Sequence, residues 1–247
     1  MSDFASQAGR WYRPDGTPAY TMIGANGKER AVTLRDARKE GLKPSVTSIL
    51  RLVDKPGLTQ WFIKNAILSA RTLPPIEFES DDSYERRIIL DSQEKQNTVM
   101  ALGTAIHGAI EKAYLGETYP QEYIPHVQAT KDAVEALYSG LEWSSERSFA
   151  TDRFGGKLDL SAEGVVIDFK TKEFKPEDKV LPYDEQIWQL SAYRQGLGMP
   201  LAKCVNVYIS TNNPGLVKVI EHTEEKAIWG WNCFRALLDF YYAKTGL

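Results

Sequence analysis

Apolar residues recur along the chain with two spacings, which predict helices towards both ends and strands between them. One set of apolar residues has the spacing of three or four that is typical of one helix face: Val99, Leu102, Ile106, Ala109, Ile110 and Ala113. Besides 84–114, which holds this stripe, the ranges expected to be helical are 58–70, 126–141, 185–197 and 224–242. Runs rich in β-branched and aromatic residues predict strands over 146–150, 154–160, 165–170, 204–210 and 217–221. Helices on both sides of a central group of strands predict an α/β or α+β sandwich in one domain.

The helical ranges carry further expectations. The apolar anchors expected for the helix over 58–70 are Trp61, Phe62 and Ile67. Two prolines and several acids at 74–82 are typical of a connector. The range 84–114 is compatible with one helix or with two pieces that meet near 96–98, and Gly116 is placed to end it.

The first 43 residues form a separate region in this interpretation. Their short aromatic or β-branched pieces are broken by the turn-forming pairs Asp15-Gly16 and Asn26-Gly27, so a small hairpin region is expected. We therefore divide the chain into an N-terminal hairpin and basic extension, 1–43, and a main domain, 44–247.

Composition is that of an ordinary globular protein, with 43% hydrophobic and 26% charged residues in 247. No apolar run is long enough to cross a bilayer, and the N-terminus has no apolar signal core, so a cytoplasmic protein is expected. Cys204 and Cys233 suggest neither a disulfide framework nor a zinc site. The net charge of −3 hides a basic stretch, 10–55, and an acidic one, 77–94. A basic groove for nucleic acid is neither excluded nor supported by these numbers.

The run VVIDFKT carries opposite charges inside an apolar strand. Because side chains alternate between the two faces of a strand, Asp168 and Lys170 point to the same face. If 163–164 form a two-residue turn, Asp159 lies directly opposite Asp168, with Cβ atoms roughly 5 Å apart. Two carboxylates there repel unless a cation lies between them, and oxygen ligands favour Mg²⁺ or Mn²⁺. A lysine beside the ion could orient or deprotonate a water or stabilise a developing charge, which suits phosphodiester hydrolysis. The alternative is a salt-bridged surface hairpin.

Six further residues are candidates with structural alternatives. Glu111 lies four residues after His107 and on the same helix face. The two are either a pair of ligands or ordinary helical residues. Gln189 and Tyr193 share a helix face and suit uncharged contacts to phosphate or bases, or are plain polar surface positions. The hydroxyls of Ser45 and Thr47 cap the following helix or bind phosphate at its N-terminus.

These pieces occur in a characteristic order. The order is G-T-x-x-H at 103–107, Glu146, G-x-x-D at 156–159, D-x-K-T at 168–171 and Q-x-x-x-Y at 189–193. From about residue 45 to residue 242 the chain thereby resembles the PD-(D/E)XK nuclease superfamily, and within it the RecB-type exonucleases. It is similar in particular to the mitochondrial genome-maintenance and phage exonucleases. The fold implied by the resemblance is a restriction-endonuclease-like core, a central mixed β-sheet flanked by helices, with added helices.

The resemblance also implies roles for these residues. The metal ligands would be His107, Asp159, Asp168 and the main-chain carbonyl of Phe169. Lys170 would position and activate the attacking water. Contacts to DNA, or support of the lysine, would come from Gln189, Tyr193, Thr171, Ser45 and Thr47. The possible accessory residues are Glu111 and Glu146.

The function implied is a metal-dependent DNA exonuclease that uses Mg²⁺ or Mn²⁺ and acts on single-stranded ends or flaps. The expected partners are DNA with a free end and recombination, repair or replication proteins, in a bacterium or a phage-infected cell, without a membrane. Two cysteines cannot hold the iron–sulfur cluster of some relatives, and no nucleotide-binding G-x-x-x-x-G-K-[S/T] motif occurs. Two alternatives stay open: a structure-specific endonuclease of the same superfamily, and a non-catalytic DNA-binding or assembly protein on a nuclease scaffold.

Overall fold

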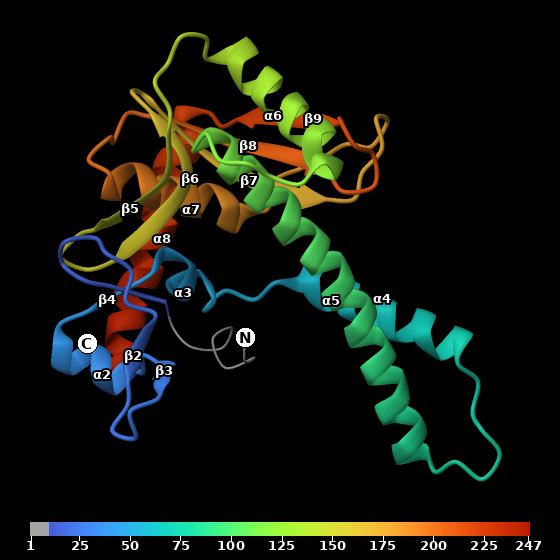
Figure 1. Ribbon diagram of the computed structural model, residues 1–247. Helices are drawn as coiled ribbons and strands as arrows, with labels where there is room; N and C mark the ends of the chain where they lie inside the picture. Colours follow the sequence, from blue (N-terminus) through green and yellow to red (C-terminus); the bar gives the residue numbers. More distant parts are fainter. Residues whose placement is uncertain (1–9) are drawn as a thin grey trace.

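A five-stranded mixed sheet lies at the centre of the chain in the computed structural model, which describes residues 10–247. The strands are β5 (Ser144–Ala150), β6 (Gly155–Ala162), β7 (Val165–Lys172), β8 (Lys203–Ser210) and β9 (Val217–Glu221), side by side in this order. Neighbouring strands are antiparallel except β7 and β8, which are parallel and joined through a helix. This arrangement confirms the expected fold class, a mixed sheet flanked by helices (Figure 1).

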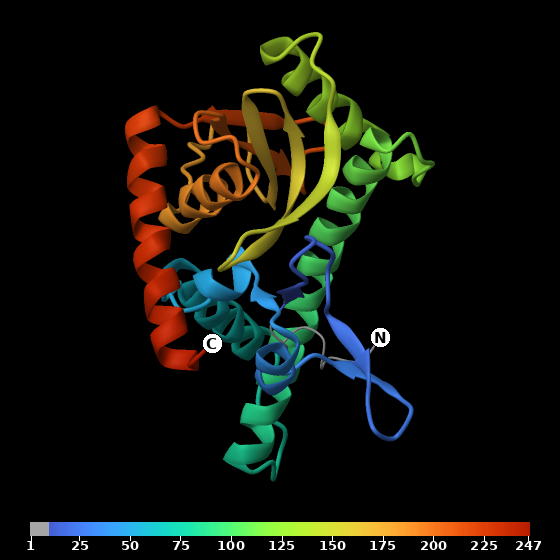
Figure 2. The same cartoon turned by 90° about the vertical axis from the view of Figure 1, so that its left-hand side faces the viewer.

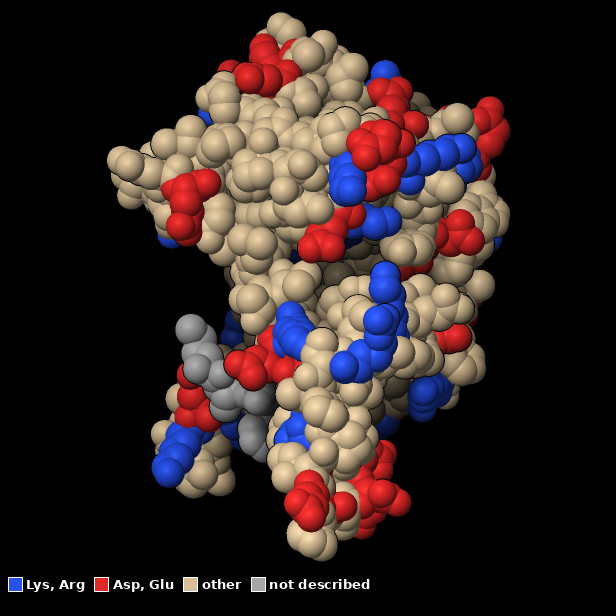
Figure 3. Space-filling model, turned by 90° about the vertical axis from the view of Figure 1, so that its right-hand side faces the viewer, with Lys and Arg blue, Asp and Glu red and all other residues tan. Residues whose placement is uncertain are grey.

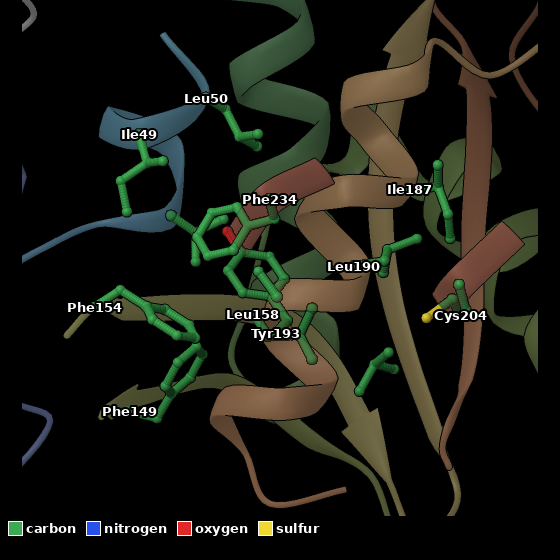
Figure 4. Packing of buried hydrophobic residues seen from close by; sticks show 14 of the residues in the cluster. Ile49, Leu50, Phe149, Phe154, Leu158, Ile187, Leu190, Tyr193, Cys204 and Phe234 are labelled. Atoms are coloured by element: carbon green, nitrogen blue, oxygen red, sulfur yellow. The ribbon is translucent and has the colours of Figure 1, made fainter. Parts of the chain in front are cut away.

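Helices cover both faces of the sheet. The second half of α5 (Asp81–Tyr114) and α6 (Ile124–Leu137), preceded by the short 3₁₀ helix η1 (Gln121–Tyr123), pack on one face around Ile106 and Ile167. The other face is covered by α3 (Val46–Leu50), α7 (Asp184–Gly196) and α8 (Glu224–Thr245), as Figure 2 shows. In this second core the aromatic rings of Phe149, Phe154 and Phe234 surround Leu158 (Figure 4). Every strand that carries a candidate residue packs against one or both of these cores.

Every helix and strand predicted from the apolar spacing is present, with ends shifted by at most four residues in the helices and two in the strands. The possible break near 96–98 is absent, because α5 is one continuous helix of 34 residues. Polar side chains there bond within the helix: Gln96 donates to Ser92, and Thr98 donates to the carbonyl of Glu94. Gly116 has a φ of 74°, just past the end of α5, as expected of a helix stop.

Helix α4 (Pro56–Thr72) and the first half of α5 form an arm that projects from the sheet (Figure 1). The prediction that Phe62 and Ile67 are buried anchors is wrong, since they are 39% and 56% exposed on this arm. The first part of the α5 stripe is exposed as well, through Val99 and Leu102. An apolar face can be read from the spacing, but what covers it cannot. The loop at 73–80 forms the tip, and acidic side chains gather at this lower end of the molecule (Figure 3).

The described part of the N-terminal region contains the expected hairpin. Strands β2 (Thr21–Ile23) and β3 (Glu29–Ala31) pair antiparallel around the Asn26-Gly27 turn. Strand β1 (Trp11–Tyr12) pairs with β4 (Lys43–Pro44), which crosses the predicted boundary between the extension and the main domain. The sequence interpretation missed α2 (Leu34–Glu40), whose signal is a capping box formed by Thr33 and Asp36. None of the helices within residues 10–247 is both long and apolar enough to cross a bilayer.

Candidate active site

Strands β6 and β7 separate at the position of the two acids. Their ladder pairs Ala162 with Val165 and ends at the pair Leu160–Ile167, so the predicted two-residue turn and register are confirmed. Asp159 and Asp168 come next in this register, but no ladder pair joins them. Asp159 instead turns its carboxylate Oδ2 to the N–H of Phe169, 2.7 Å away. The two acids therefore lie at a split in the sheet, where helices from both faces can reach them.

Asp168 and Lys170 form a close ion pair on one face of β7. Lys170 Nζ lies 2.6 Å from Oδ2 of Asp168 and 2.8 Å from its Oδ1. The Asp168 side chain is only 2% exposed, and burial raises its pKa, opposed by the lysine and reinforced by the charge of Asp159. Burial alone lowers the pKa of Lys170, but the two carboxylates outweigh it and raise the pKa above its usual value. Lys170 is thus an ammonium at neutral pH.

His107 reaches Asp159 from the opposite side of the sheet. Its Nε2 lies 3.1 Å from Asp159 Oδ2. Burial lowers the pKa of His107, but the hydrogen bond and charge of Asp159 prevail and raise it. Burial likewise raises the pKa of Asp159, but His107, Lys170 and the Phe169 N–H lower it below the usual value. Helix α5 can come this close because it has Gly103 beside β7, where an added Cβ would lie 2.6 Å from Thr171 Oγ1.

Helix α7 contributes a hydrogen-bonded branch that begins at the lysine. Gln189 Oε1 accepts from Lys170 Nζ at 3.4 Å, and Gln189 Nε2 donates to the hydroxyl of Tyr193 at 2.9 Å. Because the lysine can only donate, this contact also fixes the orientation of the Gln189 amide. The ring of Tyr193 is buried and packs against Gly156, where an added Cβ would lie 2.7 Å from Cε1. The shared face expected for Gln189 and Tyr193 is therefore present, and it points at Lys170.

Two residues that the sequence interpretation missed hold Asp168 from behind. Asn206 on β8, fully buried, donates from Nδ2 to Asp168 Oδ2 at 3.0 Å. Its Oδ1 lies 2.8 Å from Nε2 of His222, so this nitrogen carries the proton. Asn206 lies inside the apolar strand CVNVYIS, an anomaly of the same kind as Asp168 in its own strand. That signal could have found Asn206, whereas no local pattern marks His222.

The remaining predicted residues have contacts of other kinds. Ser45 Oγ accepts from the N–H of Ser48 at 3.0 Å, so the capping interpretation is confirmed, and Thr47 Oγ1 lies 3.1 Å from Ser45 Oγ. Within residues 10–247 the carboxylate of Glu111 makes no hydrogen bond or ion pair. Glu146 lies on β5 with a φ of 55°. Its carboxylate forms an ion pair with Lys157, so it does not join Asp159 and Asp168 at the split.

An open cavity of about 540 Å³ lies over this split. Its floor includes His107, Lys170 and Thr171, and its other lining residues are Val99, Met100, Gly103, Thr104, Phe169, Lys172, Glu173 and Thr211. One wall is thus the apolar and small side chains of α5, and the other is the polar end of β7. On the side of the arm the surface is hollowed in the middle of the molecule, and both basic and acidic side chains lie near this hollow (Figure 3).

The chemistry of the donors suits a hard divalent cation. Asp159 and Asp168 offer carboxylate oxygens, the donors that Mg²⁺ and Mn²⁺ favour, whereas the imidazole nitrogen of His107 is a softer donor than these hard ions prefer. As the side chains stand, however, no three His, Cys, Asp or Glu residues in the part of the chain described here form a group that could hold a metal. Three of the four carboxylate oxygens already accept from Lys170, Asn206, His107 or the Phe169 N–H. The metal site stays a prediction.

Comparisons with known proteins give weak similarities. No protein-family model matches the chain, and no curated protein matches it. Among solved structures, the alkaline exonuclease LHK-Exo from Laribacter hongkongensis is similar with a TM-score of 0.28 and 14% identity, over 76% of this chain and 98% of that one. The crystal structure of SSO0001 is similar with a TM-score of 0.25 and 16% identity, over 56% of this chain and 74% of that one. With TM-scores this low, neither similarity carries an argument about the function of this chain.

Proposed function

We propose that this chain is a metal-dependent DNA exonuclease that hydrolyses phosphodiester bonds at single-stranded ends or flaps in recombination, repair or replication. The observation that carries the proposal is the meeting of Asp159, Asp168, Lys170 and His107 at the split between β6 and β7, where His107 and Lys170 line an open cavity. Three of these four side chains come from the sheet and one from α5, so two layers of the fold build one charged site inside apolar surroundings.

Each residue has a role that its surroundings support. Hydrolysis joins the water oxygen to phosphorus, breaks one P–O ester bond and places a proton on the leaving oxygen. Lys170 is an ammonium held at Asp168, so it can donate to the water or to a phosphoryl oxygen and stabilise the charge that develops there. Gln189 keeps the ammonium in place from the side of α7. Asp159 and Asp168, with His107, would hold the cation.

Mg²⁺ or Mn²⁺ bound by these residues would supply Lewis-acid polarisation of the scissile phosphate. The buried carboxylate of Asp168 and the partly buried one of Asp159 need positive charge, which Lys170 and His107 provide in part. This need for positive charge favours a cation site over the alternative of a salt-bridged surface hairpin. We expect Mn²⁺ to raise the melting temperature of the wild-type protein but not that of Asp159→Ala. An unchanged melting temperature of the wild-type protein on adding Mn²⁺ would contradict the metal proposal.

The direct test is digestion of a single-stranded oligonucleotide with Mg²⁺, with the label placed at either end in turn. Lys170→Met keeps the aliphatic stem and removes the ammonium, so we expect binding to persist and cleavage to fall by at least about 10²-fold. Lys179→Met is the matched control, because Lys179 is exposed and outside the cavity. Undiminished cleavage by Lys170→Met would contradict the proposed mechanism.

A covalently closed single-stranded circle separates the exonuclease from an endonuclease of the same superfamily. An exonuclease requires an end, so the circle should persist while the linear strand of the same sequence is digested. Cleavage of the circle would establish the endonuclease alternative. Binding of both forms without any cleavage, and without a Mn²⁺-induced thermal shift, would instead favour a non-catalytic DNA-binding protein.

A further inference from the structure

The N-terminal strand reaches the split in the sheet from the far side of the site. The N–H of Arg10 donates to Ser48 Oγ at 3.1 Å, and its carbonyl accepts from the N–H of Ser45 at 2.9 Å. Ser45 in turn bridges to Gly155 at the start of β6, in the parallel direction. The edge of β6 that β7 leaves is therefore covered by two segments, 10–12 and 45–48.

Tyrosine side chains gather where this segment meets α7. Tyr12 packs so closely on Gly155 that an added Cβ there would lie 2.6 Å from the Cβ and Cγ of the tyrosine. Its hydroxyl lies 2.7 Å from that of Tyr20, whose ring has the guanidinium carbon of Arg10 at 5.9 Å from its centroid. Burial raises the pKa of both Tyr12 and Tyr193, and the charge of Arg10 opposes this rise in each. Arg10 thus acts electrostatically on the branch that begins at Lys170.

Among the described residues, this group of side chains has more hydrogen-bond donors than acceptors to receive them. In the Tyr12–Tyr20 pair one hydroxyl donates to the other, which leaves one O–H without an acceptor in residues 10–247. Tyr193 accepts from Gln189, so its own O–H also has no acceptor within that range. The guanidinium of Arg10 makes no ion pair there, unlike Arg30, Arg87, Arg153 and Arg194, each of which binds a carboxylate. Tyr12 and Tyr193 are 2% and 3% exposed, so unmatched donors here favour an acceptor from outside the described residues.

We propose that Arg10, with the hydroxyls of Tyr20 and Tyr193, forms a second phosphate subsite for the nucleic acid strand whose scissile phosphate lies at Lys170. The subsite takes a neighbouring phosphate of the same strand, and it rests on the function proposed above. A planar guanidinium matches two phosphate oxygens at once, and phenol hydroxyls add neutral donors. The N-terminal region then contributes a substrate contact that lies outside the motifs of the nuclease resemblance.

The test is binding of a fluorescent single-stranded oligonucleotide, measured by anisotropy in EDTA over a range of salt concentrations. Arg10→Ala should weaken binding about tenfold at low salt. It should also reduce the slope of log K against log salt by about 0.7, the value for one phosphate contact on a single strand. Arg10→Lys should keep the slope and lose part of the affinity, because it keeps the charge without the fork. The control is Arg13→Ala, whose exposed guanidinium bonds to the carbonyl of Pro18.

A second substrate distinguishes failure of the subsite from failure of the nuclease proposal. Bis(p-nitrophenyl) phosphate has a scissile phosphodiester and no neighbouring phosphate, so with Mn²⁺ Arg10→Ala should lose much less activity on it than on the oligonucleotide. Wild-type affinity and salt slope in Arg10→Ala would overturn the subsite even if the oligonucleotide is cut. Equal loss of activity on both substrates would also overturn it, because Arg10 would then act on the site as a whole. A wild-type protein that neither binds the oligonucleotide nor hydrolyses the small diester overturns both proposals.

Discussion

Replacing Asn206 by leucine tests whether the hydrogen bonds behind Asp168 hold the site in place. Leucine is close to asparagine in shape but has no polar atoms, so Asp168 Oδ2 loses the donor at 3.0 Å and His222 Nε2 loses its acceptor at 2.8 Å. A lost hydrogen bond to a carboxylate costs about 1.5–3 kcal/mol, and a buried donor left without a partner costs about 1–3 kcal/mol. The added apolar contacts offset part of this, so we expect the free energy of unfolding to fall by about 2–4 kcal/mol.

The measurement is urea unfolding, supported by calorimetry. For a chain of this length each kcal/mol corresponds to about 2–4 °C, so the melting temperature should fall by about 4–16 °C. The matched control is Asn232→Leu on the exposed side of α8, which should change stability by no more than about 0.5 kcal/mol.

A double-mutant cycle with His222→Phe gives the decisive result. Each single variant leaves one buried polar group of the pair without its partner, whereas the double variant removes both. The cost of the double variant should therefore be smaller than the sum of the single costs by about 1–3 kcal/mol. Strict additivity would refute the reasoning, because it would mean that Asn206 and His222 contribute independently of each other.

Further predictions concern pH and packing. Burial lowers the pKa of His222 to about 4, below its unfolded value of about 6.5, so the unfolded state binds more protons between these values. Stability should fall as the pH drops from about 6.5 to about 4 and then level off for this group, and urea titrations should show a weaker fall in His222→Gln. Gly196→Ala would drive a Cβ into the ring of Phe149, and calorimetry should show a loss of about 1–3 kcal/mol. Gly108→Ala in α5 meets no atom within 4 Å, so the same measurement should show a gain of up to about 1 kcal/mol.

The sequence predicted the layers of the fold because the elements that bury an apolar face show it in their spacing. The strand that holds Asp168 and the helix that holds His107 were both expected, and each ends within a few residues of its predicted limit. The arm was less predictable: Ile67 has helical spacing like a core residue and yet is 56% exposed. Periodicity identifies an apolar face on one helix, whereas burial depends on a second element that the local sequence does not specify.

The candidate site was predictable where a charge interrupts an apolar run. Asp168 and Lys170 stood out for that reason, and the hairpin register brought Asp159 to them. Register alone, however, predicts that Asp159 and Asp168 form a regular cross-strand pair, and the structure does not have this pair. The carboxylate of Asp159 takes the place of a ladder bond to Phe169, a substitution that depends on how far the two strands have separated.

That separation also explains why the N-terminal segment lies beside the candidate site. Once β7 leaves β6, the edge of β6 at Gly155 needs a new neighbour, and the segment around Ser45 supplies it. The N-terminal strand follows through its hydrogen bonds to this segment, which brings Arg10 and Tyr12 to the gap. The split thus accounts both for the open cavity and for a chain segment more than a hundred residues away that lies at its rim. Such a contact leaves no periodic signal, because its cause is the vacant edge of another strand.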